Sequence, residues 1–325
     1  MKKYLLIGFL FLVHVTLKAQ VIEQLSPQER KQLTKVTEPI TLYKGLLRAG
    51  LSANFMVQDK FFDVDRKKTF YEGNFSGYAM ASIFSLHYGI TDRLEITASL
   101  PYYNLKNSGS YTFEIPYTDE IETQKTIIRS TGLGDIMASL RYQLIQHQGN
   151  SPSLTFGFTF HFPTGKNGVT DYKGPRDYDG AISKGEWAIS PEFKIRKVSY
   201  PFSFEFGAIV TKYFGANKTL LPDTEPVKII SGIEMLIVPQ INFHLNEWVS
   251  MSHSLDYYLA KKDDFDGEDA FGYHNNQYDQ WVVRYYPSIT FQVKQLRLEQ
   301  VVLIPLAGKV FTADPSFYFI AQYTF

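Results

Sequence analysis

The sequence contains no cysteine among its 325 residues. This absence excludes disulfide bonds, thiolate metal sites and the lipid-carrying cysteine of a lipoprotein. The charges balance at 33 basic and 33 acidic residues, so no basic surplus points to nucleic acid. The apolar run near the start, Leu5 to Leu17, is too short to cross a bilayer as a helix.

The N-terminus has the features of a secretory signal. Lys2 and Lys3 precede the apolar run, and Ala19 is a small residue at the expected cleavage point. We therefore predict a signal peptide over residues 1–19 and a mature chain that begins at Gln20. Removing the lysines of this segment leaves the mature chain slightly acidic.

The chain ends in a strongly alternating stretch, Pro315 to Phe325. Every second residue is aromatic or alanine, namely Phe317, Phe319, Ala321, Tyr323 and Phe325. A period of two predicts a β-strand with one apolar face. The pattern resembles the last strand of bacterial outer-membrane barrels, which the barrel assembly machinery recognises and which closes the barrel against the first strand.

Alternation of this kind recurs along the chain. Aromatic residues make up 16% of the sequence, yet the mean hydropathy is only −0.18. A barrel wall gives this combination, because one face of each strand meets lipid and the other a polar interior. The predicted strands are Leu46 to Val57, Phe75 to Tyr88, Arg93 to Tyr103, Gly134 to Leu144, Leu154 to Phe162, Trp187 to Ile195, Phe202 to Tyr213, Val227 to Leu245, Val249 to Tyr257, Trp281 to Val293, Leu296 to Ile304 and the closing strand.

The gaps between these strands alternate between short and long. Short periplasmic turns and longer outer loops are typical of an outer-membrane barrel with both termini in the periplasm, whereas a secreted β-sandwich has no reason to show that asymmetry. The longest predicted loops are Asn104 to Thr131 and Pro163 to Glu186. We predict an all-β fold, a transmembrane antiparallel β-barrel of about twelve strands over residues 45–325.

Residues 20–44 form a short periplasmic segment before this barrel. Ser26 to Glu29 has the order of a capping box, with proline at the first helical position. This predicts a short helix through about Val36, and a flexible periplasmic leader is the alternative.

The polar phase of the strands predicts the residues that line the lumen. If Tyr103 lies opposite Leu133, facing residues on these strands have numbers that sum to roughly 236. This register matches Glu95 with Arg141 and Thr97 with Ser139. The predicted lumen-lining residues are Ala79, Glu95, Thr97, Ser139, Arg141, Gly157, Glu192 and Arg284.

Side-chain size on that phase predicts where a solute would pass. Between residues 75 and 162 the inward positions are small and mostly uncharged, and elsewhere many are charged. The sequence thus predicts a path beside the small residues, which Ala79→Trp or Gly157→Trp should narrow.

No catalytic or metal constellation emerges. Ser252, His253 and Ser254 are adjacent, and adjacent strand residues point to opposite faces, so they cannot act as nucleophile and base for one another. The acidic loop from Asp263 to Asp269 departs from the EF-hand order, so a solvated loop, with a divalent cation shared with lipopolysaccharide as one option, is favoured over a calcium site. We predict no enzyme, metal or cofactor.

Three stretches together suggest a family. They are His-Tyr-Gly-Ile-Thr-Asp-Arg-Leu-Glu-Ile (87 to 96) with Leu-Pro-Tyr (100 to 102), Gly-Leu-Gly-Asp-Ile-Met-Ala-Ser-Leu-Arg-Tyr (132 to 142), and Phe-Pro-Thr-Gly (162 to 165). The chain resembles the outer-membrane barrels grouped as the putative meta-pathway of phenol degradation family. This resemblance implies an outer-membrane protein linked to uptake of small compounds, aromatic ones among them, and it supplies no catalytic residues.

These observations predict a channel or facilitated uptake path for small molecules, aromatic or hydrophobic ones included, in the outer membrane of a Gram-negative cell. The expected partners are outer-membrane lipids, lipopolysaccharide, the barrel assembly machinery and the solute. The alternative is a structural or surface-binding barrel whose function lies in its long outer loops.

Overall fold

The fold was analysed in a computed structural model, which describes residues 41–70, 76–114, 121–146, 151–167, 177–179, 182–218, 227–266 and 278–325. The predicted signal peptide and the predicted short helix lie outside these residues. So do most of residues 20–44 and the end of the acidic loop, Glu268 and Asp269.

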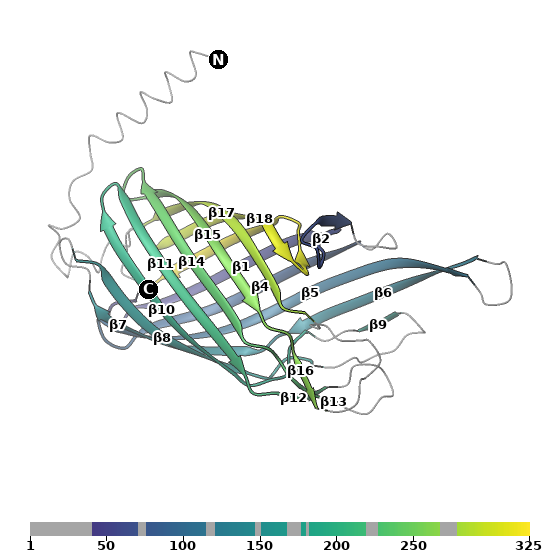
Figure 1. The fold of residues 1–325 in the computed structure, drawn as a ribbon. Coiled ribbons are helices and arrows are strands. Elements are labelled where there is room, and N and C mark those ends of the chain that lie inside the picture. The colour runs from purple at the N-terminus through teal and green to yellow at the C-terminus, as the bar shows by residue number, and fades with distance from the viewer. Residues whose placement is uncertain are drawn as a thin grey trace, which may run out of the picture.

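Twelve antiparallel strands form a closed barrel (Figure 1). They are β1 (Leu47–Gln58), β4 (Ser76–Gly89), β5 (Leu94–Glu114), β7 (Ile136–Ile145), β8 (Ser153–Phe162), β10 (Ala188–Ser199), β11 (Phe202–Tyr213), β14 (Glu234–His244), β15 (Val249–Ala260), β17 (Gln280–Val293), β18 (Leu296–Lys309) and β20 (Ser316–Thr324). Each wall strand pairs with two neighbours, and the β4–β5 pairing completes the ring. The predicted fold class is confirmed.

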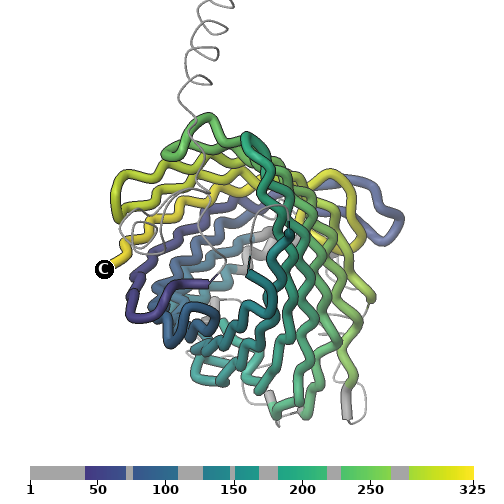
Figure 2. Tube along the Cα trace, turned by 90° about the vertical axis from the view of Figure 1, so that its left-hand side faces the viewer, coloured from purple at the N-terminus to yellow at the C-terminus, as the bar shows by residue number. Residues whose placement is uncertain are grey.

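The first and last wall strands pair directly. β1 runs antiparallel to β20, with Arg48 opposite Thr324 and Phe55 opposite Phe317. Figure 2 shows this seam, where the first strand in purple lies beside the last strand in yellow. The aromatic closing strand therefore has the role that its pattern predicted, because pairing leaves no open edge.

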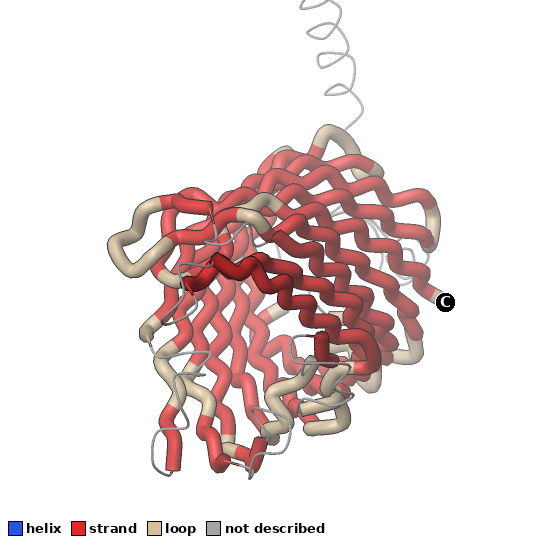
Figure 3. Tube along the Cα trace, turned by 90° about the vertical axis from the view of Figure 1, so that its right-hand side faces the viewer, coloured by secondary structure: helices blue, strands red, loops and turns tan. Residues whose placement is uncertain are grey.

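The two ends of the barrel differ. At one end, short turns such as Ile90–Arg93 connect neighbouring strands, and the C-terminus lies at this end. At the other end, the connections are longer and contain two small sheets (Figure 3). One sheet joins β2 (Lys60–Phe62), β3 (Lys68–Phe70) and β19 (Phe311–Thr312), and the other joins β12 (Ala216–Lys218), β13 (Val227–Ile230) and β16 (Asp264–Asp266). By the usual orientation of such barrels, the short-turn end is periplasmic.

The predicted loop Asn104 to Thr131 is wrong. β5 continues past the wall to Glu114 and pairs with β6 (Ile121–Leu133), and the two project as a long hairpin (Figure 1). β9 (Asp177–Asp179) runs parallel to part of β6. Outside the membrane the hairpin needs no apolar lipid face, so its sequence lacks the alternation by which the wall strands were recognised.

The predicted long strand Val227 to Leu245 is also wrong, because it divides into β13 and β14. The break falls at Ser231, whose backbone amide and hydroxyl both donate hydrogen bonds to the buried carboxylate of Glu186. These bonds draw the chain away from the wall ladder. β10, β15 and β18 instead run beyond their predicted ends.

The barrel is apolar outside and polar inside. Leu51 is 51% exposed and Phe158 is 48% exposed on the outer face, whereas Ser203 and Thr155 on the inner phase are buried. A soluble protein would place these two sets the other way round. Among the described residues, no helix is long and apolar enough to cross a membrane.

Candidate functional site: the barrel lumen

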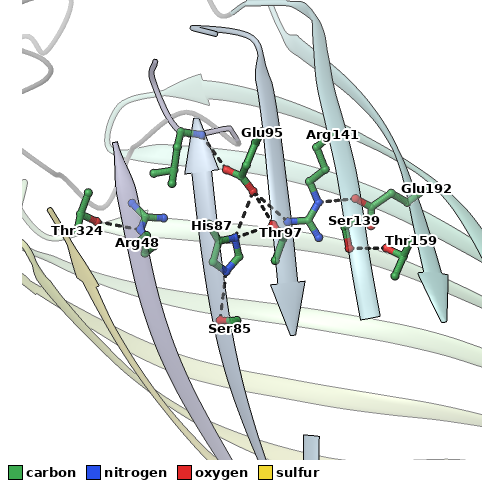
Figure 4. A network of polar contacts seen from close by, with 11 residues as sticks. Arg48, Ser85, His87, Glu95, Thr97, Ser139, Arg141, Thr159, Glu192 and Thr324 are labelled. Atoms are coloured by element: carbon green, nitrogen blue, oxygen red, sulfur yellow. Dashed lines mark hydrogen bonds and ion pairs between the residues drawn. The ribbon is translucent and has the colours of Figure 1, made fainter. Parts of the chain in front are cut away.

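Glu95 is the centre of a polar network on the inner wall (Figure 4). Its carboxylate is 3% exposed and accepts hydrogen bonds from the backbone amide of Leu42 at 2.8 Å and from the Thr97 hydroxyl at 3.2 Å. A ring nitrogen of His87 lies 3.2 Å away, and a guanidinium nitrogen of Arg141 lies 3.6 Å away. These partners satisfy a buried charge that would otherwise be costly.

The register of this wall follows the sequence expectation. Glu95 lies opposite Arg141, and Thr97 lies opposite Ser139. The pair from which this register was derived, Tyr103 opposite Leu133, is wrong by one residue, because Leu133 lies opposite Tyr102.

Gly157 allows the network to extend across β8. Arg141 on β7 and Glu192 on β10 flank this strand, and their side chains meet over it, with Arg141 Nε 2.5 Å from Glu192 Oε1. A Cβ atom at position 157 would lie 2.6 Å from Glu192 Oε1 and 3.0 Å from Arg141 Cγ. The glycine is therefore required for a contact between side chains, and the space beside it is filled.

A strap of chain, Thr41–Lys44, runs along the periplasmic end of the inner wall, past β4, β5 and β7. Thr41 and Leu42 are buried, and the Thr41 hydroxyl donates to Gln143 Oε1 at 3.0 Å. The Lys44 amide donates to Asp92 at the turn between β4 and β5. The sequence analysis placed these residues in the periplasmic segment and did not predict their partners. The main donors are backbone amides, which no side-chain pattern reveals.

An inner cavity of about 460 Å³ lies within the ring of wall strands. Its charged lining residues are Arg48, Arg141, Lys194, Arg196, Arg297, Glu192, Glu205 and Glu299. Its neutral polar lining residues are Thr155, Gln240, Asn242, Ser250, Ser252 and Thr290. Most of them belong to β10, β11, β14, β15, β17 and β18, so this cavity lies mainly away from the small residues where the path was predicted, although Thr155 on β8 is one of those residues and lines the cavity.

Arg284 belongs to a different cluster, nearer the outer end. Its guanidinium donates two hydrogen bonds to Asp256, at 2.9 and 2.6 Å, and the Tyr286 hydroxyl donates to the same carboxylate. Tyr258 and Phe311 place their rings 5.8 Å from the guanidinium. Phe311 comes from β19 in an outer connection, so this connection packs against the lumen wall.

A second outer contact comes from the connection between β8 and β10. Lys184 Nζ lies 2.5 Å from Glu234 Oε1 on β14 and 4.0 Å from the Tyr213 ring centroid. Ser183 donates to Asp135 at the start of β7. Side chains from two outer connections therefore narrow this end of the lumen.

The structure thus brings some of the predicted lumen residues together and places others apart. Glu95, Thr97, Arg141 and Glu192 share one network, Gly157 lies between two of them, and Ser139 contacts Thr159 at 2.8 Å beside it. Ala79 lies apart on β4, between Met56 and Leu105. The prediction missed Arg297 and Glu299, although the alternating polar phase of Leu296 to Ile304 indicates both.

His253 and its two serine neighbours lie on opposite faces of β15. His253 is exposed on the outer face and stacks on Tyr285, whereas Ser252 and Ser254 point inward and are buried. Within the described part of the chain, no three His, Asp or Glu side chains are grouped as metal ligands would be.

Comparisons with known proteins agree with this architecture. The family model described as Putative MetA-pathway of phenol degradation matches residues 59–295. The COG4313 outer membrane channel from Pseudomonas putida F1 aligns over 89% of this chain and 99% of its own, with 13% identity and a TM-score of 0.64. The β-domain of the Bordetella autotransporter BrkA aligns over 87% of this chain and 100% of its own, with 10% identity and a TM-score of 0.46.

No curated protein matches the chain. The family match covers well over half of the sequence, and the apolar outer face, the closed ring and the fold of the COG4313 channel agree with it. The chain is an outer-membrane β-barrel and belongs to the Putative MetA-pathway of phenol degradation family.

Proposed function

We propose that this barrel is a narrow channel that admits small solutes across the outer membrane. The observation that carries the proposal is the inner cavity, whose lining of charged and hydroxyl groups can replace the hydration of a polar solute. A twelve-stranded barrel lies between small barrels filled by side chains and large porins with wide pores. A restricted path is the behaviour expected at that size.

The lining favours polar solutes. The predicted uptake of aromatic or hydrophobic molecules rests on the family resemblance and the family description, so simple aromatics belong in the test. The lumen-lining role of Glu95, Arg141 and Glu192 is part of the proposal, as are a mature chain that begins at Gln20 and partners that include lipopolysaccharide and the assembly machinery.

The test is solute flux through the refolded mature chain in liposomes, with sugars, amino acids and simple aromatics as solutes. We expect at least one class to cross faster than through empty liposomes. A second preparation without residues 20–44 measures how much the strap and the segment before it restrict the path. If nothing crosses in either preparation, although heat-modifiable migration shows folded barrels, the channel proposal fails.

The alternative function is surface binding, and the β5–β6 hairpin favours it. This hairpin extends beyond the wall, and in the described part of the chain it pairs with β9 along three residues. Exposed strand edges are sites where partners add a strand. Deleting residues 110–125, which lie beyond the last pair between β4 and β5, should leave solute flux intact if the barrel is a channel. Lost binding to cells or surfaces, with no flux in either form, would favour the alternative.

A further inference from the structure

We propose that the inner cavity is an anion site, and that it selects small hydrophilic solutes carrying a carboxylate or a similar anionic group. The inference rests on the proposed channel function and narrows its substrate class. Its basis is the kind and placement of charge around the cavity.

Cations outnumber carboxylates in the lining. Arg48, Arg141, Lys194, Arg196 and Arg297 face Glu192, Glu205 and Glu299, an excess of two positive charges. Glu95 lies behind Arg141, and counting it still leaves an excess of one. A charged cleft with low-dielectric walls concentrates ions of the opposite sign, so this excess favours anions.

Two of these cations share one carboxylate. Lys194 forms an ion pair with Glu205, and Arg196 Nε lies 3.3 Å from Glu205 Oε1. Arg297 has a partner of its own, since a guanidinium nitrogen lies 3.3 Å from Glu299 Oε2. Glu205 cannot balance the two positive charges of Lys194 and Arg196, so a carboxylate brought by a solute would enter a favourable field.

The wall between these cations supplies neutral hydrogen-bonding groups. Gln240 and Asn242 on β14, and Ser250 and Ser252 on β15, line the same cavity. Hydroxyl and amide groups can bind the hydroxyls of a hydrophilic solute while the cations hold its charge. These groups also bond to one another, as Gln240 does to Asn242, and an apolar aromatic molecule would gain no hydrogen bond from them.

The volume suits this class of ligand. About 460 Å³ falls within the range of small-molecule sites, roughly 300 to 1,000 Å³. Gly207 contributes to this space, since a Cβ atom there would meet nothing closer than a carbonyl oxygen at 3.8 Å.

The test is the reversal potential of the refolded mature protein in planar bilayers under a potassium chloride gradient. We expect chloride to permeate better than potassium, and Lys194→Gln to reduce the permeability ratio by about two- to fivefold. Lys197→Gln is the matched control, because it removes the same charge from the lipid-facing phase of the same strand. Glu299→Gln should raise the ratio.

A solute series measures selectivity on molecules of similar size. Gluconate should enter liposomes faster than glucose, and glucose faster than glucosamine, with the differences reduced in high salt by screening. If the wild type conducts but prefers potassium, or if Lys194→Gln and Lys197→Gln behave alike, the anion site is wrong and the channel stands.

Measurements of equilibrium binding distinguish the proposed anion site from the proposed channel. Calorimetry of the folded protein in detergent, with gluconate as the probe, should show binding that Lys194→Gln weakens and Lys197→Gln preserves. Absence of gluconate binding to the wild type would overturn the anion site. Binding with this variant pattern, together with no flux, would support the site and reject the channel.

Discussion

Two arcs of the barrel wall differ in the size and charge of the side chains on their inner faces. The small-residue arc, β4 to β8, carries glycine, alanine, serine and threonine at most inward positions, whereas the charged arc, β10 to β18, carries arginine, lysine and glutamate. The inner cavity lies mainly against the charged arc. This cavity therefore lies mainly beside the longer, charged side chains and not beside the smaller ones.

The reason is that neighbours occupy the space that small residues leave. Arg141 and Glu192 fill the site beside Gly157, and the strap Thr41–Lys44 covers the periplasmic end of β4 and β5. On the charged arc, ion pairs along the wall hold long side chains against it, as Arg196 and Glu205 do. Gly207 lies among these pairs and keeps open space.

We expect the largest effect on solute flux when Gly207, which faces open space, is replaced by a large side chain. Gly207→Trp should reduce flux by about tenfold or more, because its ring would enter the inner cavity, where narrow lumens respond steeply to side-chain volume. Liposome flux measures this directly. Ala79→Trp, on the small-residue arc, should change flux less than about twofold.

The matched control is Phe206→Trp, which places the same ring at the adjacent, lipid-facing position of β11. It should fold and conduct like the wild type. Equal loss of flux in Ala79→Trp and Gly207→Trp would show that both arcs border the path and would remove the contrast between them.

The next largest effect is expected on the free energy of unfolding when Glu95, which binds the strap Thr41–Lys44 to the small-residue arc, is replaced. Glu95→Leu removes the acceptor for the Leu42 amide and one of the carboxylates beside Arg141. We expect the free energy of unfolding to fall by about 3 kcal/mol, because a buried donor and a buried charge lose a partner. Urea unfolding followed by gel migration measures it.

Glu95→Gln serves as the conservative variant, since its amide oxygen can still accept the Leu42 hydrogen bond. It should lose less stability than Glu95→Leu. If both variants unfold at the wild-type urea concentration, Glu95 does not anchor the strap.

A smaller loss of stability is expected when Gly157 is replaced, and a still smaller one when Gly207 is replaced. Gly157→Leu forces apart the Arg141–Glu192 pair and should cost about 1 to 3 kcal/mol, as overpacking usually does. Gly207→Leu meets open space and should change the free energy of unfolding much less. Similar losses at both glycines, measured by the same urea unfolding, would contradict the assignment of filled and open space.

The sequence predicted the wall well because two solvents act on every strand. Lipid on one face and water or polar groups on the other impose a period of two, so β11 was predicted residue for residue and the Glu95–Arg141 register followed. Outside the membrane this constraint disappears. The β5–β6 hairpin and the break at Ser231 were missed for that reason.

The site was less predictable than the wall. The sequence indicates which side chains share the polar phase of a strand, and Glu95, Arg141 and Glu192 meet in one network (Figure 4). It does not indicate which inward side chains fold against one another, since the Arg141–Glu192 contact spans a strand between them. The strap depends on backbone amides, which every sequence has.

The smallest effect is expected for an ion pair with the same chemistry as those of the charged arc but placed in water. Lys261 Nζ donates to Asp279 at 2.7 Å on the outer surface, and both side chains are largely exposed. The bonds from Lys261 and from the Lys262 amide hold the pKa of Asp279 below its usual range. Because this pKa is lowered, the pair stabilises the fold above the unfolded pKa of about 4 and loses that contribution as pH falls through the folded value. Lys261→Met should lower the free energy of unfolding by less than about 0.5 kcal/mol at pH 7, and the difference should shrink near pH 3. Urea unfolding at the two pH values measures it, and a loss at pH 7 as large as that of Glu95→Leu would mean that burial in the lumen is not what strengthens the inner pairs.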